Sequence, residues 1–223
     1  MRFWGMSVIG LLGSAILLSL GVWQVQRLSW KISVLENIEA KVSAPARALP
    51  AVVSEKADSL LSVRVLGQYK GETLRVLVSQ KLYGAGYRLI TKLEIEDGRQ
   101  ILVDRGFVSV RAQMTATPEG IGELIGNLHW PSEIDSFTPE NDVDANIWFS
   151  RDVATLAAEL RTEPILLVLR DSSFVKEKAT SLPVDVAGIP NDHLQYAVTW
   201  FSLAIIWLGM SGYFLYRSRD SQS

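Results

Sequence analysis

Two long, uncharged apolar runs lie near the ends of the chain, and the segment between them alternates apolar and polar residues. No charged residue stands between Arg2 and Arg27, and none stands within 194–216. A helix of about 20 apolar residues crosses the hydrocarbon core of a bilayer, so each run is long enough to span a membrane. Trp4 and Trp23 bracket the first run, as expected for amphipathic rings at the two membrane interfaces.

These runs predict a transmembrane helix over 3–26 and a second one over 192–216, with a tail over 217–223. The first run is longer than the apolar part of a signal peptide, and no A-x-A-like cleavage site follows it, which favours an uncleaved anchor. Two spans place both termini on one side of the membrane. Because a long loop can be translocated regardless of its charge, we expect both termini in the cytoplasm and the central domain outside it.

The segment after the first run changes its hydrophobic period. Over 27–44 apolar residues recur at near-helical spacing, which predicts a helical extension that ends before Pro45. The following segment, 45–189, predicts a mainly β extracytoplasmic domain. Its alternating stretches predict strands over 63–69, 73–79, 87–96, 99–110, 122–130 and 164–172.

Turn and helix signals separate these strands. The tripeptide 70–72, Lys-Gly-Glu, predicts a turn, and Asp97-Gly98 predicts a hairpin. One short helix is predicted within 150–161, capped by Asp152. Its buried face would consist of Val153, Leu156, Ala157 and Leu160. The fold class is therefore a membrane protein whose N- and C-terminal helices flank an α+β, mainly antiparallel-β domain, arranged as a compact sheet or a small barrel.

Composition excludes several classes of function. The chain has no cysteine, which excludes iron–sulfur clusters, thiolate zinc sites and cysteine nucleophiles. The net charge is −2, so nucleic acid is not an expected partner. His129 is the only histidine of the middle segment, and no nucleophile elbow accompanies it, so we interpret it as a half-buried residue in a turn. We therefore expect a protein that is not an enzyme.

Six segments, taken together and in order, are similar to the surfeit locus protein 1 family. They are "LGVWQVQRLSWK" from Leu20, "GQY" from Gly67, "GAGYRLIT" from Gly84, "ILVDRGFV" from Ile101, "WFSRD" from Trp148 and "PNDHLQYAVTWFSLA" from Pro190. With the two-span layout they cover nearly the whole chain. None of these segments is specific alone, but their common order makes the resemblance specific.

The resemblance implies a non-enzymatic assembly factor for a haem–copper terminal oxidase, cytochrome c oxidase or a quinol oxidase. Such a factor would bind haem a transiently or hand it to the catalytic subunit of the oxidase. The implied partners are that subunit and the lipid bilayer. The machinery that synthesises haem a is a further candidate partner. The implied location is the plasma membrane of a bacterium or the mitochondrial inner membrane, with both termini on the cytoplasmic or matrix side.

His193 is the candidate ligand because it begins the second apolar run. Asn191 is a good N-cap, which would place His193 in the first helical turn, where the helix dipole disfavours the charged imidazolium. The neutral ring is the form that binds iron. Residues at steps of three and four continue one stripe from it: Tyr196, Ala197, Trp200, Ala204 and Trp207. The resemblance favours His193 as a ligand of haem iron, with Tyr196 and Trp200 packing on the macrocycle, for which Ala197 and Ala204 would leave room.

Spacing alone leaves other interpretations open. Small residues also pack helices together in bilayers, and His193 could serve as an interfacial anchor or as a hydrogen-bonding residue against the first span. A scaffold that stabilises a nascent oxidase subunit without haem, or a two-span sensor, is an alternative function. Arg105, Arg151 and Arg170 are candidates to pair with haem propionates, and Asp104 with Arg105 is expected to join a polar network.

Overall fold

The computed structural model describes residues 2–112, 116–174, 178–186 and 189–220. They divide into two compact units. One contains the chain up to Asn37 and from Val186 onward, and the other contains Ile38–Asp185. The first unit is the pair of terminal helices, and the second is a small barrel with the last turn of the first helix.

The two terminal helices are α1 (Arg2–Val42) and α4 (His193–Asp220). Both are long and apolar enough to cross a membrane. α1 continues well past the apolar run and ends before Pro45, which cannot extend a helix. The prediction of a membrane protein with a transmembrane helix at each end, flanking a sheet domain, is confirmed.

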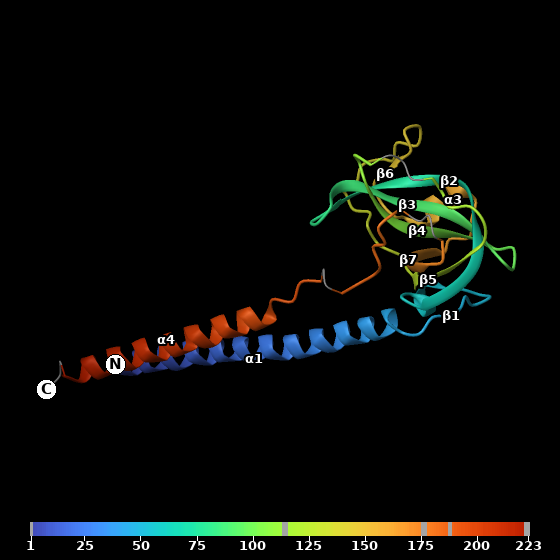
Figure 1. The fold of residues 1–223 in the computed structure, drawn as a ribbon. Helices are drawn as coiled ribbons and strands as arrows, with labels where there is room; N and C mark the ends of the chain where they lie inside the picture. Colours follow the sequence, from blue (N-terminus) through green and yellow to red (C-terminus); the bar gives the residue numbers. More distant parts are fainter. Residues whose placement is uncertain (1, 113–115, 175–177, 187–188, 221–223) are drawn as a thin grey trace. The chain divides into compact units, whose positions relative to one another are not determined.

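The domain is a closed barrel, as Figure 1 shows. Its five main strands are β2 (Ser62–Gln80), β3 (Gly84–Ile95), β4 (Gln100–Ser109), β5 (Gly122–Leu128) and β7 (Leu166–Ser172). They pair in the order β2-β3-β4-β7-β5, and β5 pairs back with β2, which closes the ring. All of these pairs are antiparallel except β4 with β7.

Shorter elements decorate the barrel. They are β1 (Arg47–Ala48), α2 (Glu55–Asp58) and β6 (Ile147–Trp148). β1 and β6 each pair in parallel with β2. The sequence left a compact sheet and a small barrel open, and the structure shows the barrel, with additional short strands at its margin.

One predicted turn is wrong. Residues 70–72 do not separate two strands, because β2 runs through them as a single bent strand with a register shift between Lys70 and Thr73. Gly71 has φ +69 and supplies the left-handed conformation of the bulge. β3 pairs with β2 on both sides of this bulge, over 67–70 and 73–80, while β5 pairs with the first part of β2, Ser62–Gly67. The Asp97-Gly98 hairpin is confirmed, with Gly98 at φ +84 between β3 and β4.

The helix α3 (Val153–Leu160) forms where the sequence predicts it. The side chain of Asp152 accepts a hydrogen bond from the Thr155 backbone N at 2.8 Å, as an N-cap does. The four predicted apolar residues are its buried residues and pack against core side chains of β2, β4 and β7. A second apolar cluster fills the barrel interior around Val63, Leu93 and Ile101.

Candidate functional site

The two membrane helices pack closely because glycines of α1 face large side chains of α4. A Cβ added at Gly13 would lie 2.5 Å from Trp207 Nε1, and one added at Gly21 would lie 2.7 Å from Phe201. The Trp207 indole N–H donates a hydrogen bond to the Gly10 carbonyl at 3.1 Å. Small residues at such positions let two helices approach within a bilayer.

The small residues of α4 lie in this helix contact. Ala197 and Ala204 are 3 % and 0 % exposed, and they lie on the same stripe as Trp207. We expected these two positions to leave room for a flat ligand. The structure instead fills that face with the packing of α1 against α4, so a macrocycle would have to lie along another edge of the helix pair.

His193 is held by a polar contact at the buried face of α1. Its Nδ1 lies 2.8 Å from Oε1 of Gln24, which is 8 % exposed. Because the amide oxygen accepts, the imidazole Nδ1 is the donor of this hydrogen bond, which leaves Nε2 as the ring nitrogen available to a further partner. A hydrogen bond to the first span was one of the open interpretations, and the structure shows it. It does not exclude a ligand role, since histidines that bind metals use their second nitrogen in this way.

The helix begins differently from the prediction. α4 starts at His193, so Asp192 is the residue directly before it. Asn191 was expected to be the N-cap, but its buried Oδ1 has no hydrogen-bond partner among the described residues. His193 is nevertheless in the first turn, as expected.

Tyr196 and Trp200 follow His193 on successive turns of α4. Tyr196 is 55 % exposed, and His193 and Trp200 are partly exposed. The three side chains therefore offer one imidazole and two aromatic rings at an accessible edge. A separate apolar cavity of about 180 Å³ lies at the opposite end of the helix pair, with Gly10 and Phe214 in its wall.

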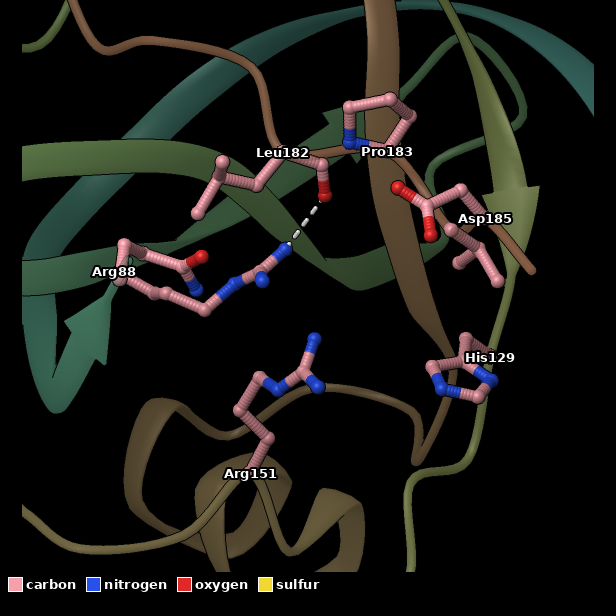
Figure 2. A pocket seen from close by; sticks show the side chains of 8 residues that line it. Arg88, His129, Arg151, Leu182, Pro183 and Asp185 are labelled. Atoms are coloured by element: carbon pink, nitrogen blue, oxygen red, sulfur yellow. Dashed lines mark hydrogen bonds between the residues drawn. The ribbon is translucent and has the colours of Figure 1, made fainter. Parts of the chain in front are cut away.

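The barrel domain contains a second candidate site, a cavity of about 320 Å³. Its lining residues are Gln80, Arg88, His129, Arg151, Leu182, Pro183, Val184 and Asp185. Figure 2 shows the guanidinium groups of Arg88 and Arg151 directed into the same space, with the His129 ring beside it. Arg88 belongs to β3, His129 follows β5, and Arg151 precedes α3.

A chain of ion pairs fixes the two arginines. Arg88 Nε donates to Asp104 Oδ2 at 2.6 Å, and Arg151 Nη1 lies 3.3 Å from the same oxygen. The other oxygen of Asp104 accepts from the Gly106 backbone N at 3.1 Å. Arg151 also pairs with Glu133, and Arg88 Nη2 donates to the Leu182 carbonyl at 2.7 Å (Figure 2).

Burial shapes the electrostatics of this cavity. Burial lowers the pKa of Arg88, and the nearby positive charge of Arg151 lowers it further. The negative charge of Asp104 acts in the opposite direction but does not outweigh burial. Burial and the charge of Arg151 likewise lower the pKa of His129, so this ring is neutral at pH 7. Burial opposes ionisation of Glu133, but its hydrogen bond to Arg151 prevails and its pKa is lowered.

The three arginines considered for propionates have different surroundings. Arg105 is 0 % exposed and lies over the Tyr69 ring at 5.2 Å. Arg170 donates to the Val42 carbonyl at 2.9 Å. Arg151 lines the cavity. The predicted polar network exists at Asp104, but it recruits Arg88 and Arg151, while the neighbouring Arg105 side chain turns toward Thr117.

Arg88 was not among the site residues predicted from the sequence. The signal was present, because the similar segments "GAGYRLIT", "ILVDRGFV" and "WFSRD" supply Arg88, Asp104 and Arg151 respectively. These segments lie far apart in the chain, and closure of the barrel brings them together. Only the structure shows that they form one network.

The fold and its helix pair define a class: a membrane protein with two spans and one small β-barrel domain between them. The sequence model of the SURF1 family matches residues 11–205. The chain belongs to the SURF1 family.

Individual relatives agree with this assignment. A SURF1-like protein of Rickettsia felis is 33 % identical over 89 % of this chain and 92 % of its own length. Surfeit locus protein 1 of Xenopus tropicalis is 31 % identical over 83 % of this chain and 67 % of its own length. Surfeit locus protein 1 of Homo sapiens is 30 % identical over 83 % of this chain and 69 % of its own length.

Proposed function

We propose that this protein is a non-enzymatic assembly factor for a haem–copper terminal oxidase, and that it holds haem a and passes it to the catalytic subunit. His193 would bind the haem iron through Nε2, and Tyr196 and Trp200 would contact the macrocycle. Family membership supports the assembly role. The observation that supports haem binding is the Gln24–His193 hydrogen bond.

That hydrogen bond has two chemical consequences. It places the imidazole proton on Nδ1, so that Nε2 is the nitrogen with a lone pair for iron. It also restricts rotation of the ring about its side-chain bonds. A single protein ligand of this kind suits a cargo that must leave again, because only one coordinate bond has to be broken.

The exposed edge of α4 suits a largely apolar cargo. Tyr196 and Trp200 present aromatic surface beside the histidine, at the end of a membrane helix where amphipathic rings are stable. We propose that both termini lie in the cytoplasm or matrix and that the barrel domain lies on the opposite side of the membrane. The haem would then bind at the boundary between lipid and the outer aqueous phase.

The test is the optical spectrum of the full-length protein purified from cells that synthesise haem a. We expect a haem spectrum in the wild-type protein and its loss or a clear shift in His193→Ala. Gln195→Ala is the matched control, because it changes an exposed neighbour on the same helix and should leave the spectrum intact. An unchanged spectrum in His193→Ala would contradict the ligand assignment.

A second readout separates this proposal from a scaffold without haem. If the purified protein never carries haem, yet co-purifies with the catalytic subunit of the oxidase, the scaffold is supported. Normal haem content of the oxidase after deletion of the gene would contradict both functions and favour a sensor role.

A further inference from the structure

We propose that the cavity of the barrel domain lined by Arg88, His129 and Arg151 binds a small monocarboxylic acid. The proposal concerns the barrel domain alone and is independent of whether the helices hold haem. The cavity volume of about 320 Å³ falls at the lower end of the range of small-molecule sites. It therefore suits a compact ligand of one carboxylate and a short body.

The two arginines of this site share one buried carboxylate. The side chains of Arg88 and Arg151 are 10 % and 13 % exposed, and both bind the same oxygen of Asp104, which is wholly buried. The second partner of Arg151, Glu133, is 35 % exposed and so is screened by water. Arg88 therefore shares its one carboxylate partner with Arg151, which has Glu133 besides. An oxyanion in the cavity would bind at the guanidinium donors that Arg88 leaves unused.

One donor of Arg88 is unused at this cavity. Arg88 uses Nε and Nη2, while its Nη1 makes no hydrogen bond to a described residue. A ligand oxygen would bind at this donor. The His129 ring also lines the cavity, but its Nδ1 is fully buried and has no partner in the described part of the chain. Guanidinium groups match the planar geometry of a carboxylate.

The remaining walls define the rest of the ligand. Leu182, Pro183 and Val184 form an apolar side of the cavity, which favours a hydrocarbon body. The Asp185 carboxylate also lines the cavity (Figure 2). Its negative charge disfavours a second anionic group on the ligand. The site should therefore prefer a monocarboxylate to phosphate or to a dicarboxylate.

The experiment is a titration of the detergent-solubilised full-length protein with sodium benzoate, sodium phosphate and sodium chloride at equal ionic strength. We expect a saturable rise of the unfolding temperature with benzoate only. In protein labelled with ¹⁵N-histidine, the His129 resonance should move on addition of benzoate, while that of His193 should not. Equal effects of the three salts would overturn the proposal.

Variants locate the binding. Arg88→Lys keeps the charge but loses the planar fork, and we expect its Kd for benzoate to rise at least tenfold. Arg64→Lys is the matched control, since Arg64 is an exposed residue of the same barrel paired with Glu123, and it should bind as the wild type does. If Arg88→Lys does not fold, the same titration of His129→Phe decides, with weaker binding expected. Wild-type affinity in the tested variant would overturn the proposal.

Discussion

Replacing Gln24 by leucine tests whether the first span positions His193. Leucine fills a similar volume but offers no acceptor, so Gln24→Leu removes the 2.8 Å contact to His193 Nδ1. The imidazole could then carry its proton on either nitrogen and rotate. The shape of the helix contact should survive, because the glycines that allow close packing are unchanged.

The expected effect follows from two quantities, the energy of one hydrogen bond between membrane helices and the metal affinity lost when a histidine loses its orienting partner. A hydrogen bond between membrane helices contributes about 0.6 kcal/mol on average and up to about 1.7 kcal/mol, so the helix pair should remain folded. Loss of the partner that orients a metal-binding histidine typically weakens metal affinity by about 10- to 100-fold. We therefore expect the Kd for haem a to rise at least about tenfold with only a small change in stability.

The assay is a spectrophotometric titration of the detergent-solubilised apoprotein with haem a. Gln26→Leu is the matched control, because it makes the same substitution at an exposed position of the same helix. The reasoning fails if Gln24→Leu and wild type bind haem with the same Kd while His193→Ala does not bind it. In that case His193 would act as a ligand without help from Gln24.

Three further predictions follow from the packing and charges. The double variant Gly10→Cys/Ser211→Cys should form a disulfide on mild oxidation, because a Cβ at Gly10 would lie 3.1 Å from Ser211 Cβ. The chain has no native cysteine, so gel mobility reports this bond alone. Absence of the cross-link would contradict the helix packing. Gly106→Ala should destabilise the barrel by about 2 kcal/mol or more in denaturant unfolding. Gly106 has φ +112, and a Cβ there would lie 2.2 Å from the Thr180 backbone oxygen. A Gly106→Ala variant as stable as the wild type would refute this prediction. The free energy of unfolding should fall on acidification in two pH ranges, because the folded pKa values of His129 and Glu133 are both lowered, so that the unfolded chain takes up each proton before the folded protein does. The first range lies below about pH 6.5, for His129, and the second below about pH 4.5, for Glu133. His129→Phe should remove the upper range, and an unchanged profile in that variant would contradict the prediction.

The elements with strong local signals were predictable. The uncharged runs specify both membrane helices, since few other structures accommodate so many consecutive apolar residues. The Asp97-Gly98 hairpin and the Asp152-capped helix depend on neighbouring residues alone, and both form as predicted. The turn at 70–72 was wrong because a glycine with positive φ serves a bulge as well as a turn. A bulge forms here because β3 pairs with the residues on both sides of it, over 67–70 and 73–80.

The site was only partly predictable for the same reason. His193 stands out because a titratable residue begins an apolar run, and its position in the chain suffices to notice it. Its contact with Gln24 depends on the register of two helices that are distant in sequence. The convergence of Arg88, Asp104 and Arg151 depends on closure of the barrel, which no local pattern specifies. The alanines of α4 were ambiguous, since a flat ligand and a packed helix require the same small side chains.

The state of the His193 ring is the most direct test of the central claim, which is that a neutral imidazole anchored through Nδ1 offers Nε2 to haem iron. Nitrogen-15 NMR of histidine-labelled protein in detergent at pH 7 reports both nitrogens. We predict a protonated Nδ1 and an unprotonated Nε2 for His193, and selective broadening or a shift of its Nε2 resonance when haem a is added. A protonated Nε2, or a His193 signal that haem leaves unchanged, would contradict the account.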